Sequence, residues 1–378
     1  MIKEHIASSF EARFGQPHLM VFSPGRLNII GEHTDYNEGF VFPAAIDKGI
    51  YAAFGKCDSE LCKVIALDMN ESYEFTLDNI TPLENGDWRN YVLGVTKGIL
   101  DAGKKITPFN LVFGGDIPEG AGLSSSAALE NAVVFGLNEL FDLGLTKEEM
   151  IFISQKAEHS FVGVKCGIMD QFASMFGQKN TALLLDCRSI SAKSFDIDLQ
   201  EYQILLINTN VKHSLSESAY NKRRAVCEKV AAILGIQALR DADIPLLESI
   251  AEQIPDEEYQ MARYVIEENK RTQKAVIAVQ ANDIAELGQL MYRSHHGLQH
   301  QYKVSCEELD FLVDRAKLNP DIAGSRMMGG GFGGCTINMI KKDAVTNYAE
   351  KTAAAYLEKF ERNCSVYEVS LSQGTHLI

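Results

Sequence analysis

The chain has 378 residues, of which 46% are hydrophobic and 23% are charged, a balance typical of a soluble globular protein. This length exceeds the roughly 250–300 residues that one hydrophobic core usually supports, so we expect two domains. The formal net charge of −15 argues against a nucleic-acid partner, because a duplex-binding surface needs clustered Lys and Arg.

Two further features of the sequence concern its compartment. The first ten residues lack the apolar core of a signal peptide, and no later segment is long and apolar enough to span a bilayer. Eight cysteines lie singly, without a CxxC pair or a metal-finger spacing. We therefore expect a cytoplasmic protein with reduced thiols, no membrane partner and no obligate protein partner.

A polar cluster follows the first predicted elements, which are a helix and a strand over residues 19–24 that stops at the proline. The cluster offers Arg26, Glu32, His33 and Asp35 between apolar anchors. Carboxylates and imidazole bind adjacent hydroxyls, so the pattern suits a sugar. A solvated turn with salt bridges is the more frequent origin of such a cluster. A metal site ranks third, because the spacing fits no zinc pattern.

The next predicted elements lead to a flexible loop. Alternating residues predict strands between 49 and 75, residues 87–100 predict a helix, and residues 109–114 predict a further strand. Two glycines, Gly120 and Gly122, then precede the hydroxyls Ser124–Ser126 at the start of a helix. That helix has one predicted apolar face, formed by Ala127, Leu129, Ala132, Val133, Leu137 and Leu140.

This loop is typical of a phosphate site, since glycines let successive N–H groups converge and a helix N-terminus attracts anions. An ordinary serine-capped helix explains the pattern about as well. The P-loop of NTPases is excluded, because Ala121 stands where its lysine belongs.

Two carboxylates lie on the helices that follow. Thr146 and Glu149 form a capping box for a helix that contains Glu158 and ends near Gly163. Asp170 falls in the first turn of the next predicted helix. From the residues alone, Glu158 is expected to be solvated and Asp170 is expected to be a first-turn charge.

The second half of the chain begins after strand-like runs at residues 182–186 and 202–208. A polar connection over residues 188–199 between them is the expected meeting point of the domains. Residues 241–317 read as mostly helical, and His295, His296 and His300 there predict a partly exposed helix face and no metal site. Residues 329–334 contain GxGxxG, but a strand-like run follows them, which argues against a dinucleotide site.

Three segments in this order resemble the motifs of the GHMP kinase superfamily, and within it the galactokinases, over nearly the whole chain. They are the polar signature at residues 25–46, the phosphate loop at residues 118–129 and the glycine loop at residues 329–334. The resemblance implies an α+β, two-domain GHMP kinase fold with the active site in the cleft between domains. We expect an N-terminal domain over residues 1–195 and a C-terminal domain over residues 196–378.

The resemblance also implies roles for individual residues. Asp170 and Arg26 would be catalytic, and ATP and Mg²⁺ would be needed. The sugar would contact Glu32, His33, Thr34, Asp35, Gly167 and Tyr220. The phosphates of ATP would bind to Gly120, Ala121, Gly122, Leu123, Ser124, Ser125 and Ser126. Mg²⁺ would be held by Ser126 and Glu158.

The activity so implied is ATP-dependent phosphorylation of the C1 hydroxyl of galactose. N-acetylgalactosamine kinases tend to carry Ile and Cys where this chain has Thr34 and Asn37, which favours galactose. Another GHMP small-molecule kinase, or a galactose-sensing paralogue without catalysis, remains an alternative. Sensor forms can lose residues from the run at positions 124–128, which is complete here.

Overall fold

The computed structural model describes residues 2–118, 120–211 and 216–378. The helices of these ranges are α1 (Ile2–Phe14), α2 (Asp87–Asp101), α3 (Ser125–Phe141), α4 (Lys147–Ala157), α5 (Met169–Phe176), α6 (Ser216–Leu234), α7 (Ile244–Glu248), α8 (Asp256–Gln280), α9 (Ile284–His300), α10 (Glu307–Lys317) and α11 (Val345–Phe360). Short 3₁₀ or π turns are η1 (Asp35–Asn37), η2 (Glu158–Val162), η3 (Leu239–Asp241), η4 (Ala251–Gln253) and η5 (Lys342–Ala344).

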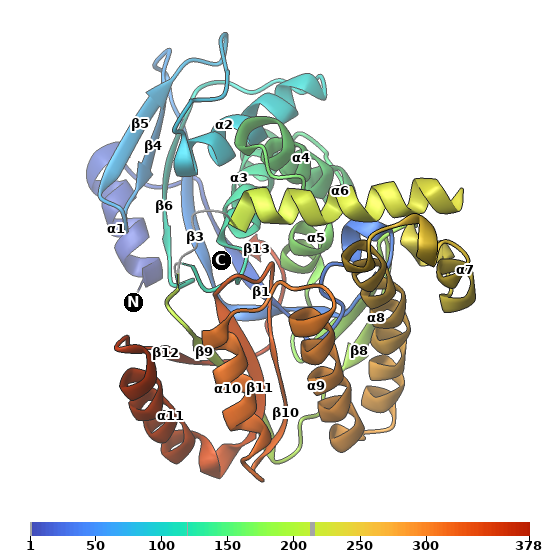
Figure 1. The fold of residues 1–378 in the computed structure, drawn as a ribbon. Coiled ribbons are helices and arrows are strands. Elements are labelled where there is room, and N and C mark those ends of the chain that lie inside the picture. The colour runs from blue at the N-terminus through green and yellow to red at the C-terminus, as the bar shows by residue number, and fades with distance from the viewer. Residues whose placement is uncertain (1, 119, 212–215) are drawn as a thin grey trace.

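The strands form three sheets. They are β1 (Leu19–Asn28), β2 (Phe40–Val41), β3 (Pro43–Lys56), β4 (Cys62–Ala66), β5 (Glu71–Phe75), β6 (Phe109–Gly115), β7 (Thr181–Asp186), β8 (Ser191–Asp196), β9 (Tyr202–Asn208), β10 (Ile322–Met327), β11 (Cys335–Lys341), β12 (Ser365–Val369) and β13 (His376–Leu377). The expected mixture of helices and sheets is confirmed (Figure 1).

The first sheet has the order β13-β1-β3-β6-β4-β5 and is antiparallel except where β4 pairs with β6. Alternation along β3 divides its two faces: Ala52 and Phe54 pack in one apolar cluster with helices α2 to α5, and Ala53 packs in another with α1. The chain end returns to this sheet, because β13 pairs with β1.

The second sheet has the order β10-β11-β9-β12 and carries helices on both faces. Leu206 and Met339 belong to the apolar cluster that includes residues of α8 and α9. Leu205 and Ile340 belong to the cluster on the side of α10 and α11. Figure 1 shows this sheet and its helices below the first sheet. Loops from both layers can therefore meet between them.

The third sheet, β2-β7-β8, corrects the expectation of a polar connection over residues 188–199. Residues 191–196 form β8, which pairs in register with β7 from Thr181↔Asp196 to Asp186↔Ser191. The strand was missed because most of its residues are exposed, so its sequence lacks an apolar face. The division into residues 1–195 and 196–378 stays a prediction.

Strand β1 also differs from its expected end at Pro24, because it continues to Asn28. Its register with β3 shifts between Pro24 and Arg26, so a bulge accommodates the proline, which has no N–H to donate. The Arg26 amide donates to the Leu123 carbonyl at 3.1 Å. The irregular part of β1 is thus the part that contacts the glycine-rich loop before α3.

Helix α3 is buried on nearly all sides, which corrects the expectation of a single apolar face. It packs against β1, β3, α2, α4 and α5. Its polar residues Glu130 and Asn131 are fully buried. The start of α3 is consequently fixed on several sides. Across the described ranges, no helix has the length and apolar character needed to cross a membrane.

Candidate active site

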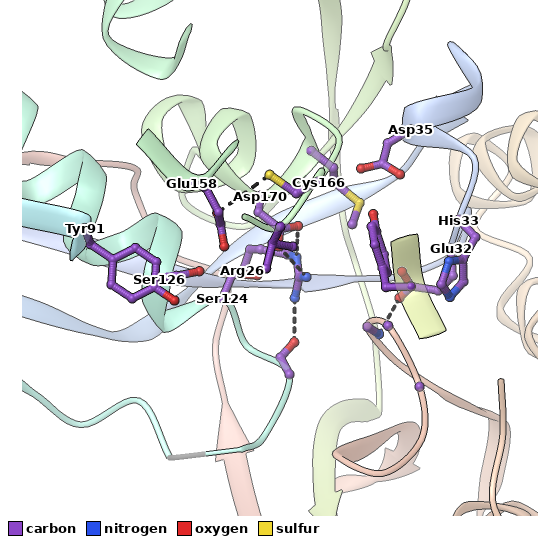
Figure 2. A pocket seen from close by; sticks show the side chains of 17 residues that line it. Arg26, Glu32, His33, Asp35, Tyr91, Ser124, Ser126, Glu158, Cys166 and Asp170 are labelled. Atoms are coloured by element: carbon purple, nitrogen blue, oxygen red, sulfur yellow. Dashed lines mark hydrogen bonds and ion pairs between the residues drawn. The ribbon is translucent and has the colours of Figure 1, made fainter. Parts of the chain in front are cut away.

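A cavity of about 390 Å³ brings together residues from both layers of the fold. Its lining residues are Arg26, Glu32, His33, Asp35, Tyr91, Gly122, Ser124, Ser126, Glu158, Val164, Cys166, Met169, Asp170, Tyr220, Gly329, Gly330 and Gly331. Figure 2 shows the labelled residues in three groups: Tyr91, Ser126 and Glu158 at one end, Arg26 and Asp170 in the middle, and Glu32, His33 and Asp35 at the other end.

The middle of the cavity is an ion pair between Arg26 of β1 and Asp170 of α5. Arg26 Nε and Nη2 donate to the two oxygens of Asp170 at 2.8 and 3.0 Å. Arg26 Nη1 donates to the Gly122 carbonyl at 2.7 Å. Because the Arg26 side chain is only 5% exposed, the fork is held rigidly. The carboxylate of Asp170 is more open, with 28% of its side chain exposed.

The glycine-rich loop reaches the same pair. Gly120 and Gly122 have φ values of 67° and 70°, and Ser124 has a φ value of 59° just before α3 begins. Ser124 Oγ donates to Asp170 Oδ2 and makes no cap bond to the helix, which corrects the cap interpretation. The loop therefore presents a helix N-terminus and bends its backbone toward the cavity, as an anion site requires.

The loop residues divide by where their side chains lie. Gly122, Ser124 and Ser126 line the cavity. Ala121 and Leu123 are buried in the apolar cluster with residues of the second sheet. Ser125 is exposed and does not line the cavity. Ser124 and Ser126 therefore line the cavity, whereas Ala121 and Leu123 anchor the loop in the apolar cluster.

Glu158 is buried, which corrects the expectation of a solvated carboxylate. Its Oε2 accepts a hydrogen bond from Gln171 Nε2 at 3.0 Å, and the Ser126 hydroxyl also bonds to it. Burial and the nearby Asp170 raise the pKa of Glu158 to about 7. Glu130, fully buried behind it, accepts from the same Gln171 nitrogen at 3.2 Å.

These groups fit a divalent cation. Several carboxylates lie close together here, and burial disfavours their negative charge. A bound cation would compensate that charge. Ser126 and Glu158 supply a hydroxyl and a carboxylate, which are the oxygen donors that Mg²⁺ takes when phosphates and water complete its shell. Within the described ranges, there is no group of three or more His, Cys, Asp or Glu residues that could hold a metal ion by protein ligands alone.

The other end of the cavity is anchored by Arg326, a residue that the sequence analysis missed. Its side chain is fully buried, and Nη2 donates to Glu32 Oε1 at 3.0 Å. Further donors of Arg326 bond to the Asn28 and Ile29 carbonyls. The Gly329 amide donates to the same Glu32 oxygen at 2.8 Å. One oxygen of Glu32 is thus held by the glycine loop and its preceding strand.

His33 and Asp35 complete this end. Burial lowers the pKa of His33 to about 4, so its ring is neutral at neutral pH. Burial and the charge of Asp170 raise the pKa of Asp35 to about 7. Gly167 packs directly on Asp35, since a Cβ added there would lie 1.9 Å from Asp35 Oδ2. Tyr220 of α6 lines the cavity beside His33, with ring centroids 5.5 Å apart.

Thr34, an expected sugar contact, does not line the cavity. Thr34 is fully buried, and its hydroxyl donates to the Gly31 and Phe40 carbonyls and so holds the turn. Among the three histidines of α9, His296 and His300 are exposed, as expected for a partly exposed face, whereas His295 is buried and accepts a hydrogen bond from the Met327 amide. The polar residues 212–214 lie outside the described residues.

Three models of protein families match the chain. The "Galactokinase galactose-binding signature" matches residues 8–56, the "GHMP kinases N terminal domain" matches residues 90–178, and "GHMP kinases C terminal" matches residues 275–357. The first match covers the segment of Arg26 to Asp35, and the second covers the glycine-rich loop and Asp170.

Similar proteins are known by sequence and by structure. A galactokinase of Chloroflexus aggregans is 42% identical over 93% of this chain and 91% of its own length. The crystal structure of Lactococcus lactis galactokinase complexed with galactose is 33% identical, with a TM-score of 0.94 and complete coverage of both chains. Methanococcus jannaschii mevalonate kinase shares the fold, with a TM-score of 0.67 and 18% identity over 94% of this chain and 99% of that chain.

Proposed function

The chain belongs to the galactokinase family, and we propose that it transfers the γ-phosphoryl group of ATP to the C1 hydroxyl of galactose in the cavity described above. The observation that carries this proposal is the convergence of three groups on one cavity: a phosphate-binding helix start, the Arg26–Asp170 pair and a cluster of hydroxyl-binding side chains. Phosphoryl transfer depends mainly on positioning and charge stabilisation, which these groups can supply.

Galactose occupies the end of the cavity that carries Glu32, His33 and Asp35. The carboxylates accept hydrogen bonds from sugar hydroxyls, and the neutral imidazole of His33 can exchange one with a sugar oxygen. Tyr220 and Gly167 complete the contact by packing beside these groups. A substrate without an array of hydroxyls leaves these buried polar groups unpaired, which gives the site its selectivity.

ATP enters from the end that carries Ser124 and Ser126. Its phosphates bind to the backbone of residues 120–126 and to the positive end of α3. Ser126 and Glu158 would hold Mg²⁺, which would neutralise part of the phosphate charge. The two substrates then meet at the ion pair between Arg26 and Asp170.

Asp170 orients the reacting hydroxyl and accepts its proton during transfer. Both Asp170 oxygens already accept hydrogen bonds from Arg26, so the carboxylate cannot rotate freely. Arg26 offsets the charge that develops on the transferred group, a role for which a rigid planar donor is suited. Because the transition state is loose, early deprotonation by Asp170 is not required.

The eight cysteines support a cytoplasmic location, which we also propose. All eight are free, and glutathione and thioredoxin keep thiols reduced in the cytosol.

One assay tests the proposed function. Purified protein is incubated with Mg-ATP and, separately, galactose, N-acetylgalactosamine, mevalonate or homoserine, while ADP and the phosphorylated sugar are quantified. We expect ADP and galactose 1-phosphate to form in equal amounts, with much slower turnover of the other compounds. Equal or faster turnover of mevalonate would overturn the proposal.

A further inference from the structure

His33 lines the cavity, and its two ring nitrogens have different surroundings. The residue is 3% exposed. Its Nδ1 lies 2.7 Å from the Tyr36 hydroxyl. Among the described residues, Nε2 has no partner within hydrogen-bond limits, although the backbone of Gly330 lies near the ring and favours a proton on it. A buried polar nitrogen of this kind calls for a ligand.

Two tyrosine hydroxyls connect His33 Nδ1 to the thiol of Cys227. The Tyr36 hydroxyl lies 2.7 Å from the Tyr302 hydroxyl, which lies 3.3 Å from Cys227 Sγ. Tyr36 belongs to η1, Tyr302 follows α9, and Cys227 belongs to α6. We call Cys227, Tyr302 and Tyr36 the hydroxyl relay. The hydroxyl relay thus connects three segments that are distant in the sequence, and it ends at the imidazole of His33.

Every member of the hydroxyl relay keeps its proton. Burial raises the pKa of Tyr36 and the pKa of Tyr302 well above the ordinary range of tyrosine. Burial also raises the pKa of Cys227 to about 11. Since each group carries one proton, the relay can point in only two directions.

In the first direction, His33 Nδ1–H donates to Tyr36, Tyr36 donates to Tyr302, and Tyr302 donates to the sulfur of Cys227. This ends on a thiol sulfur, which is a weak acceptor, and leaves Nε2 without a proton beside Gly330. In the second direction, the Cys227 thiol donates to Tyr302, Tyr302 to Tyr36, and Tyr36 to Nδ1. Here Nδ1 accepts a hydrogen bond from the Tyr36 hydroxyl, and Nε2 carries the ring hydrogen.

We propose that the hydroxyl relay fixes His33 as the Nε2–H tautomer, so that His33 donates a hydrogen bond to a sugar oxygen, and that Tyr36 and Tyr302 are positioning residues for sugar recognition. This inference rests on the proposed function. Glu32 and Asp35 can only accept hydrogen bonds when ionised, so a fixed donor beside them gives the sugar end of the cavity a mixed pattern. Such a pattern distinguishes hydroxyl arrangements that carboxylates alone would bind equally.

The tautomer can be observed directly in the wild-type protein. ¹⁵N-histidine-labelled protein is studied by NMR with and without galactose, and the His33 signals are assigned from their loss in His33→Gln. We expect a proton on Nε2 and none on Nδ1 at neutral pH in both states. A proton on Nδ1 would overturn the inference, whatever the protein phosphorylates.

Kinetics test the positioning role. Tyr36→Phe and Tyr302→Phe remove one hydroxyl each, and the matched control Tyr292→Phe removes a buried hydroxyl that has no partner among the described residues. We expect the galactose KM to rise roughly two- to tenfold in the two relay variants, as for loss of one neutral hydrogen bond, with a smaller change in kcat. The control should keep the wild-type KM.

The outcomes separate the inference from the proposed function. If the wild type does not turn over galactose, the proposed function fails, while the NMR result still decides the tautomer. If the wild type is active and both relay variants keep its KM and the Nε2–H signal, the relay does not set His33 and the inference fails. If a relay variant melts early, its KM is compared on the folded fraction at a temperature below its transition.

Discussion

Arg26 holds Asp170 through two hydrogen bonds of 2.8 and 3.0 Å and holds the Gly122 carbonyl through a third of 2.7 Å. One guanidinium therefore contacts two parts of the site. It bonds to the carboxylate that would orient the sugar hydroxyl, and it bonds to the loop that would bind the phosphates. The two substrate ends of the cavity share this group, so a change at Arg26 or Asp170 should act on transfer more than on the binding of either substrate.

We expect Asp170→Asn to lower kcat by ~10²- to 10⁴-fold, because the amide cannot accept the hydroxyl proton. Its oxygen still accepts from Arg26, so galactose affinity measured by calorimetry should largely survive. Asp321→Asn, which changes a surface carboxylate paired with Lys341, is the control and should retain wild-type kcat. Near-normal turnover in Asp170→Asn would contradict the catalytic role.

We expect Arg26→Lys to lower kcat more than it weakens galactose binding. Lysine keeps the charge but cannot reach both oxygens of Asp170 and the Gly122 carbonyl together, since it lacks the planar fork. Steady-state kinetics and melting temperature are measured on the same preparation. If Arg26 and Asp170 were only a structural ion pair, the variant would melt early while its folded fraction kept normal turnover.

The sequence predicted those cavity residues that belong to local motifs, because a motif can be recognised from residues that are adjacent in the chain. Arg26, the loop before α3 and Asp170 fall in this class. Arg326 and Tyr302 were missed, since each contacts its partner across more than 260 residues of chain and neither shows a local pattern. Their only sequence signals were weak: Arg326 stands just before the glycine loop, and Tyr302 follows a helix.

The fold was predictable to a similar degree. Strands with an apolar face, such as β6 and β9, were found at nearly the correct residues. The exposed strand β8 was missed, and β1 was ended too early at Pro24, because bulges depend on a partner strand that a local pattern does not show. Burial of Glu158 was also hidden, since a carboxylate on a helix is usually solvated.

We expect Ser126→Ala and Glu158→Ala each to raise the Mg²⁺ concentration needed for half activity by about tenfold or more. Loss of a residue that only hydrogen-bonds to a metal ligand already has an effect of this size. Asp321→Asn is the control, because Asp321 forms a surface ion pair with Lys341 and lies outside the cavity lining. Calorimetric binding of Mg²⁺ with a non-hydrolysable ATP analogue gives a second readout. Unchanged metal dependence in both variants would remove Ser126 and Glu158 from the magnesium site.

We expect Gly167→Ala to displace Asp35, because the added Cβ would lie 1.9 Å from Oδ2 and 2.3 Å from Cγ of that carboxylate. Losing a hydrogen bond to a charged group should raise the galactose KM about 10- to 100-fold. The control is the same substitution in an Asp35→Ala background, where it should add little. A full additional effect in that background would show that Gly167 acts on something other than Asp35.

The last prediction concerns stability without ligands and the carboxylate of Asp35. Burial, Asp170 and Glu32 raise the pKa of Asp35 from 3.8 to about 7, against the opposing effects of the Tyr36 amide and of Arg26. Because the folded chain holds the Asp35 proton to higher pH than the unfolded chain, this group's contribution to stability is complete below about pH 4. That contribution is lost as the pH rises through about 7.

Asp35→Asn removes the titrating group and keeps the shape of the side chain. Its free energy of unfolding should therefore exceed that of the wild type by little at pH 4 and by more toward pH 8. We expect a difference in unfolding free energy on the order of 1–2 kcal/mol at pH 8. This is less than the full pKa shift of Asp35 implies, because the carboxylate faces water in the cavity. Melting temperatures of both proteins and of Asp321→Asn, taken from pH 4 to pH 8 without ligands, provide the measurement. A difference between Asp35→Asn and the wild type that is constant over this range would mean that Asp35 is already ionised in the folded protein at low pH.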